Sequence, residues 1–279
     1  MTSLSLWLAA RLPALFGWLE YGFMRNAFVA VLLISPLFGM LGTMAVDNRM
    51  AFFSDALGHS ALTGVAIGVL LGTKNQLIPM LLFGLVWAAL ITFVKHHSRM
   101  SADTIISVFS SASIALGLVI LSRGAAFAKY SSLLVGDVLS ITKGDLPWLL
   151  AALLATSAIW VFLFNPLLIT SVNAPLAKSR GIPARLTEYA FSGLVALAVM
   201  ISIRWIGVLM INSLLILPAA SARNVAKNAR SYVVLSVTIA IICGIIGLVL
   251  SYYLDTAAGA SVVLLLSAVY FATLPFRRR

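Results

Sequence analysis

The stretch FFSDALGHSALTGVAIGVLLG, residues 52–72, is apolar over nearly its whole length and carries one acidic residue and one histidine near its start. About 20 apolar residues are what an α-helix needs to cross the hydrocarbon core of a bilayer. Asp55 and His59 are four residues apart, so a helix places both side chains on one face. Ionisable residues inside such a run are energetically costly, and the pair therefore marks a candidate functional site.

Comparable apolar runs recur along the chain and predict an all-α, polytopic transmembrane helical bundle with about eight or nine spans. The 279 residues are 62% hydrophobic and 10% charged, with a mean hydropathy of +1.07, whereas soluble domains carry about 25% charged residues. This composition excludes a soluble globular enzyme. Helices are expected because the strand-length alternation of a membrane barrel is absent. The predicted spans are residues 23–46, 53–73, 76–97, 104–122, 146–169, 187–203, 206–222, 231–253 and 258–276.

The net charge of +11 is interpreted as a signal for orientation in the membrane. The basic residues occur one to three at a time between apolar runs and form no stripe, which argues against nucleic-acid binding. The positive-inside rule predicts that the first span begins outside, because 12 of the 19 basic residues then lie inside. We expect an interfacial segment at residues 1–22, a membrane domain at 23–276 and a basic cytoplasmic tail at 277–279. The lone Cys243 excludes a disulfide framework within the chain.

Asp55 and His59 supply a carboxylate oxygen and an imidazole nitrogen, both good ligands for zinc or manganese. Two ligands suit a transient site completed by water, another helix or a second subunit. An Asp–His hydrogen bond that only stabilises the bundle explains the spacing equally well. Beside the pair, small residues repeat every four positions, and such a ladder lets another helix approach closely. Its members include Ser60, Gly64 and Gly68.

Two connections are longer than a turn. The inside connection, at about residues 170–186, contains Pro175 and Pro183, which bracket a short candidate helix. The outside connection, residues 123–145, has the composition of a short helix lying on the surface. Metalloprotease, serine-hydrolase and phosphate-loop motifs are absent from the sequence. The chain is therefore expected to be no enzyme and to have no ATPase site of its own.

Several segments together resemble the membrane-spanning permease subunit of bacterial ABC-type importers for zinc, manganese or iron. The resemblance extends from about residue 23 to residue 275. Its most specific parts are RMAFFSDALGHSALTGVAIG (49–68) and RWIGVLMINSLLILPAASAR (204–223). Supporting segments are ADTIISVFSSASIALGLVI (102–120), LLVGDVLSITKGDL (133–146) and DTAAGASVVL (255–264).

This resemblance implies a homodimer in the bacterial cytoplasmic membrane, two cytoplasmic ABC ATPase subunits that hydrolyse ATP, and an extracytoplasmic metal-binding protein that delivers the ion. It implies that Asp55 and His59, which match the family's D-x-L-x-H motif, are transient ligands of the transported divalent cation, with no permanently bound cofactor. Residues 171–185, with Ala177 and Gly181, resemble the coupling helix that fits an ATPase groove.

The sequence departs from the family at two places. Ala257 and Ala260 stand where prolines are often found, and Ser110 or Ser111 replaces a histidine frequent in the fourth span of zinc-type members. Zinc is placed ahead of manganese and ferrous iron as the cargo. Uptake of a metal chelate or vitamin, and an intramembrane enzyme using His59 and Asp55 as a general base, are the alternatives.

Overall fold

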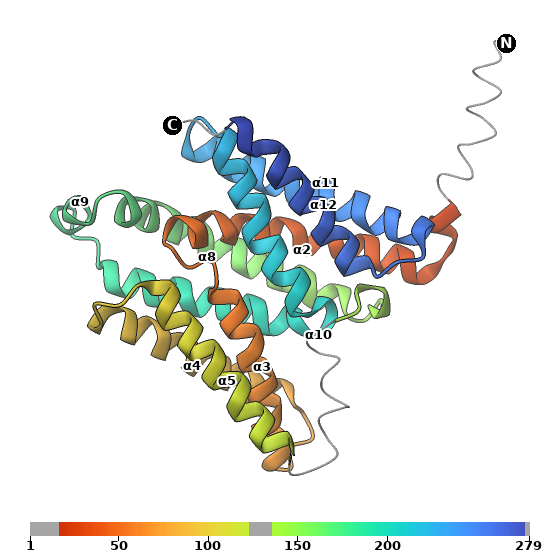
Figure 1. Ribbon diagram of the computed structural model, residues 1–279, viewed down its shortest axis with the longest axis horizontal. Coiled ribbons are helices and arrows are strands. Elements are labelled where there is room, and N and C mark those ends of the chain that lie inside the picture. The colour runs from red at the N-terminus through yellow and green to blue at the C-terminus, as the bar shows by residue number, and fades with distance from the viewer. Residues whose placement is uncertain (1–16, 123–135, 277–279) are drawn as a thin grey trace.

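The computed structural model describes residues 17–122 and 136–276, and the prediction of an all-α transmembrane bundle is confirmed (Figure 1). Eight of its helices are long and apolar enough to cross a membrane. They are α2 (Gly22–Asp47), α3 (Phe53–Leu70), α4 (Leu77–His97), α5 (Ala102–Ser122), α8 (Leu146–Val172), α10 (Ala184–Val225), α11 (Ala229–Leu254) and α12 (Ala258–Thr273). Their bounds coincide with the predicted spans to within a few residues.

The 42-residue helix α10 is two membrane crossings rather than one. At about 1.5 Å per residue it would be twice as long as the hydrocarbon core is thick. Gly207 breaks it with φ 72° and ψ 167°, a left-handed conformation that favours glycine. Residues 184–206 and 208–225 form a V with its apex at Gly207 (Figure 1). The two spans predicted at 187–203 and 206–222 correspond to these arms. Pro218 lies in the second arm without interrupting its helical backbone angles.

The bundle has two ends, named here by their landmarks. The α9 end carries the short helix α9 (Ala174–Ser179), the carboxyl end of α4 and the start of α10. The apex end carries Gly207, the connection between α3 and α4, and the start of α8. Helices α2, α3 and α10 are buried over most of their length and form the core, whereas α4, α5, α8, α11 and α12 lie around them.

Tight approaches between helices explain why small residues line α3. A Cβ atom on Gly64 would lie 2.6 Å from the Cα of Met80, so α4 packs directly on the α3 backbone at this point. The side chains of Gln76 and Pro79 lie against Gly68 in the same way. The ladder ends there, because α3 stops at Leu70 and Gly72, with φ +65°, lies in the turn beyond it.

Two expected surface segments lie partly outside the described residues. Of the segment 1–22, residues 17–20 form the 3-10 helix η1 (Gly17–Glu20), where the ring of Trp18 is buried 5.3 Å from that of Phe28. Of the connection 123–145, the described part contains one 3-10 turn, η2 (Val138–Ser140). A further 3-10 turn, η3 (Leu274–Phe276), follows α12. The predicted tail 277–279 also lies outside the described residues.

Candidate functional site

Asp55 and His59 face each other on α3, as their spacing predicts. Asp55 is in the first turn of the helix, and the Nε2 atom of His59 lies 3.5 Å from its Oδ2 atom. The imidazole is 23% exposed and the carboxylate 39%. This separation is longer than a strong hydrogen bond between charged groups. The two side chains are therefore not joined by a strong mutual hydrogen bond.

Two further helices bring polar side chains to the same carboxylate. The Nδ2 atom of Asn212, in the second arm of α10, donates a hydrogen bond of 2.8 Å to Oδ1 of Asp55. The hydroxyl of Ser110, on α5, donates to Oδ2 over 3.4 Å. Helices α3, α5 and α10 therefore converge at Asp55. The sequence patterns did not identify Asn212 as a partner of Asp55.

The amide of Asn212 is only half satisfied. Its nitrogen donates to Asp55, but its buried Oδ1 atom accepts no hydrogen bond from the described residues. A buried polar atom without a partner costs about 1–3 kcal/mol, and in native structures such an atom points to a function or a bound species. A carbonyl oxygen beside a carboxylate and an imidazole is a further donor that a cation can use.

Asp55 and His59 lie deeper in the bundle than the position of Asp55 near the start of α3 suggests. Asp55 is close to the helix start, which alone would place it near one membrane surface. Its partner Ser110, however, is the ninth residue of the 21-residue helix α5. At about 1.5 Å per residue, Ser110 lies about 12 Å from the start of α5. The contact with Ser110 therefore places the site inside the bundle rather than at its end.

Within residues 17–122 and 136–276, no cluster of three or more His, Cys, Asp or Glu side chains could hold a metal ion. Asp55 and His59 are thus accompanied by neutral oxygen donors, Ser110 and Asn212, rather than by more charged ligands. This is the chemistry of a weak site and not of a closed structural cage.

The predicted coupling segment contains the short helix α9, which Asn173 caps by accepting a hydrogen bond from the Leu176 backbone. Ala177 is completely buried within the chain, so its side chain holds α9 on the bundle and does not face outward. Gly181 is exposed and has φ +69°, which lets the chain turn after the helix. The exposed face presents Leu176 and Lys178 instead.

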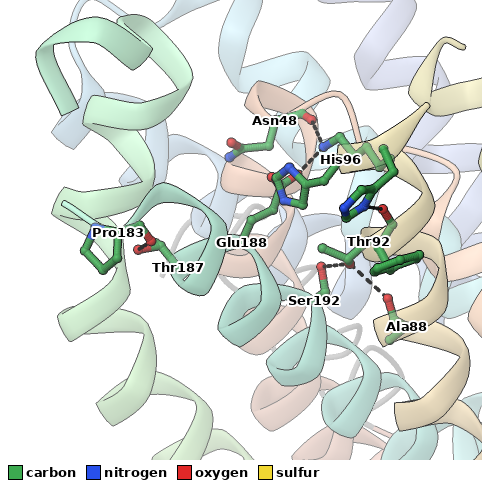
Figure 2. Close-up of polar contacts among 11 residues, drawn as sticks. Asn48, Ala88, Thr92, His96, Pro183, Thr187, Glu188 and Ser192 are labelled. Atoms are coloured by element: carbon green, nitrogen blue, oxygen red, sulfur yellow. Dashed lines mark hydrogen bonds and ion pairs between the residues drawn. The ribbon is translucent and has the colours of Figure 1, made fainter. Parts of the chain in front are cut away.

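A polar cluster lies where the first arm of α10 meets α4. Its member on α10, Glu188, is nine residues beyond the end of α9. Figure 2 shows Glu188 of α10 and His96 of α4 directed toward one another, with Asn48 beside them. Glu188 forms an ion pair with Lys95, and its Oε2 atom lies 3.0 Å from Nε2 of His96. Lys95 also donates to the carbonyl of Asn48 over 3.3 Å.

One turn deeper, the hydroxyl of Thr92 donates to that of Ser192 over 2.8 Å, again joining α4 to α10 (Figure 2). These contacts tie three helices together close to α9. Sequence reasoning missed Glu188. Its signal was weak, since an acidic residue at the very end of an apolar run is also what an ordinary helix terminus contains.

Comparison with known proteins decides the family. The model of the ABC 3 transport family matches residues 20–277, nearly the whole chain. The chain belongs to the ABC 3 transport family. This family member is 30% identical over 255 residues to the manganese import system permease protein ScaB of Streptococcus parasanguinis, covering 91% of this chain and 90% of that protein. It is 33% identical over 254 residues to the high-affinity zinc uptake system membrane protein ZnuB of Haemophilus influenzae, covering 90% and 96%.

The fold of this ABC 3 family member is similar to that of a solved structure, PsaBC from Streptococcus pneumoniae in complex with Fab. The TM-score is 0.79 at 29% identity, with 92% of each chain covered. The resemblance found in the sequence motifs is confirmed, and the chain is a multi-pass membrane permease of the ABC type.

Proposed function

We propose that the chain is the permease subunit of an ATP-driven ABC importer that moves a divalent metal cation across the bacterial cytoplasmic membrane. The observation that carries this proposal is the Asp55–His59 pair inside the bundle, approached by Ser110 and by the unsatisfied amide of Asn212. A carboxylate, an imidazole and neutral oxygens are ligands for first-row divalent cations. Relatives of similar length are named for manganese import and zinc uptake.

Zinc and manganese are the two leading cargoes, followed by ferrous iron. The imidazole of His59 suits zinc, whereas the oxygens of Asp55, Ser110 and Asn212 suit manganese at least as well. A serine at position 110, where a histidine would supply a second nitrogen, moves the donor set toward oxygen. The binding is expected to be weak, because an ion held in a tight cage would not be released to the far side of the membrane.

The two ends of the bundle would face different partner proteins. The α9 end would face the cytoplasm, where the exposed Leu176 and Lys178 of α9 are available to an ATPase subunit. The apex end would face an extracytoplasmic metal-binding protein, and a second copy of the chain would complete a homodimer. ATP would be hydrolysed by the partner. This chain would contribute no catalytic residue and hold no permanent cofactor.

Transport would follow an alternating-access scheme. ATP binding would move α9, and the move would reach α4 and α2 through Glu188, Lys95 and the carbonyl of Asn48. Because α3 and the second arm of α10 meet at the Asp55–Asn212 hydrogen bond, a shift between them would change the ligand geometry. The ion would be bound in one arrangement and released in the other.

The test is uptake of radioactive manganese and zinc by the complex with its ATPase, reconstituted in liposomes with ATP inside. The double variant Asp55→Ala with His59→Ala is expected to abolish metal uptake. A matched control, Asp103→Ala with His97→Ala, removes one carboxylate and one imidazole at exposed positions and should transport normally. Uptake that persists in the first variant at wild-type level would refute the proposed site. ATP-dependent accumulation also separates a transporter from an intramembrane enzyme.

A further inference from the structure

Three hollows adjoin Asn75 at the apex end, and they differ in the polarity of the residues that line them. The central one, of about 410 Å³, combines the polar and basic side chains of Lys74, Gln76 and Arg204 with apolar ones from α3 and α4. The two on either side, of about 560 Å³ and 620 Å³, are mainly apolar. Asn75 lines all three, Arg204 lines the first two and Lys74 lines the first and third, so the three hollows adjoin one another and are treated as one surface feature.

The apolar hollows flank α4 on opposite sides. One lies between α4 and α8 over the first arm of α10, and its lining includes Leu81, Trp148, Ala155 and Ile201. The other follows α3 and the outer face of α4 from Ile78 to Val86. That length of helix is about 12 Å, close to half of the hydrocarbon core of about 30 Å. The first groove extends along α8 from Trp148 to Ala155, about 10 Å, so each groove follows most of the depth of one leaflet.

The basic side chains lie at the level expected of a lipid headgroup. Lys74 and Asn75 lie in the connection between α3 and α4, and Arg204 lies three residues before the apex of α10. Trp148, 70% exposed in the first turn of α8, occupies the interfacial position that tryptophan favours. Neither Lys74 nor Arg204 forms an ion pair with the other described residues.

Asp145, in the groove between α4 and α8, is the acidic residue among those that line the three hollows. Burial alone would raise the pKa of Asp145, but hydrogen bonds from Thr142 and Trp205 and the charge of Arg204 lower it overall. Its carboxylate also accepts bonds of 3.0 and 2.6 Å from the Thr142 backbone and hydroxyl. One Asp against two basic side chains leaves the feature positively charged.

We infer that this feature is a binding site for one anionic phospholipid, whose phosphate lies at Lys74 and Arg204 and whose two acyl chains straddle α4. A basic hollow between apolar grooves at membrane depth is the chemistry that recognises anionic headgroups. A zwitterionic lipid would place its own cation against the two basic residues. A neighbouring protein would need no pair of chain-length grooves on both sides of one helix.

The test uses native mass spectrometry of the full-length chain with phosphatidylglycerol or phosphatidylcholine added to the detergent. Wild type is expected to retain one phosphatidylglycerol preferentially. Lys74→Gln with Arg204→Gln should weaken retention by about thirtyfold, about fivefold for each basic residue. Lys74→Arg with Arg204→Lys should retain the lipid. The matched control Arg25→Gln with Lys143→Gln makes the same change in charge outside the three hollows and should behave as wild type.

A variant that keeps the charge tests the grooves separately. Ala155→Trp fills the groove between α4 and α8 and should reduce retention of phosphatidylglycerol, with folding verified by an unchanged size-exclusion profile. Equal retention of the two lipids by wild type would overturn the inference, as would unchanged retention in the Lys74 and Arg204 double variant. A change of oligomeric state in Ala155→Trp without loss of lipid would identify the groove as a protein interface, and that too would overturn it.

Discussion

The amide nitrogen of Asn212 lies 2.8 Å from Oδ1 of Asp55 and joins two helices whose residues are 157 positions apart in the chain. The amide oxygen of the same side chain is buried and has no hydrogen-bond partner among the described residues. Asn212 therefore orients the carboxylate with one atom and leaves the other for a ligand. In the proposed metal site, a residue placed in this way would affect both the geometry and the affinity.

Replacement of Asn212 by alanine is expected to raise the KM for metal uptake by about tenfold or more, the range seen when a group that orients a metal ligand is removed. Ser213→Ala is the matched control, because the Ser213 hydroxyl donates to the Leu209 carbonyl of its own helix and forms no hydrogen bond with Asp55 among the described residues. Initial rates of uptake in liposomes over a range of metal concentrations measure the difference. An equal KM in the two variants would contradict a role for Asn212 at the site.

Introduction of a histidine at Ser110 should shift the preference of the site toward zinc. Ser110 Oγ lies 3.4 Å from Asp55, so an imidazole there would supply a second nitrogen ligand. Nitrogen donors favour zinc over manganese. We expect zinc to inhibit manganese uptake at a concentration about tenfold lower in Ser110→His than in wild type. Ser111→His, on the neighbouring and exposed position of α5, should leave the inhibition unchanged. The same shift in both variants would argue against a specific effect.

The pair Asp55 and His59 was accessible from the sequence because both residues lie on one helix, where the period of 3.6 residues fixes their relation. The approach of Ser110 and Asn212 was not. Each lies on a separate helix, and the packing of α5 and α10 against α3 decides which polar residue meets the carboxylate. Hydropathy gives no information about that packing.

The same limit applies to α9. Two prolines and a basic composition indicated a short helix in this connection, and Asn173 does cap one. The sequence could not tell that Ala177 faces the bundle, because six residues are too few for an amphipathic pattern to specify a face. The break in α10 was partly accessible, since two spans were predicted with a break at residues 204–205, but only the backbone angles place the apex at Gly207, inside the second predicted span.

The close contact at Gly64 predicts a loss of stability on a minimal change. A Cβ at this position would lie 2.6 Å from the Met80 Cα, and backbone atoms cannot move aside as a flexible side chain can. Overpacking of this kind costs about 1–3 kcal/mol, so Gly64→Ala should lower the melting temperature in detergent. Gly193→Ala is the control, since nothing lies within 4 Å of a Cβ there. Both changes gain the same helix propensity. Equal melting temperatures would show that α4 can adjust.

Glu188 offers a test of how α9 communicates with the site. The side chain is mostly buried and pairs with Lys95 and His96, so its neutralisation leaves Lys95 without a counter-charge where α4 and α10 meet. If the ATPase moves α9 and these contacts pass the movement on, Glu188→Gln should lower the number of metal ions transported per ATP hydrolysed severalfold, with ATP hydrolysis itself retained.

Arg185→Gln alters an exposed charge in the same turn region and should leave the ratio of transport to ATP hydrolysis unchanged. Exchange of the two charges, Lys95→Glu with Glu188→Lys, should restore part of the ratio, because the ion pair is re-formed in reverse. A proportional loss of ATP hydrolysis and transport in Glu188→Gln would instead indicate a damaged fold. An unchanged ratio would mean that the movement of α9 reaches the Asp55 site by another route.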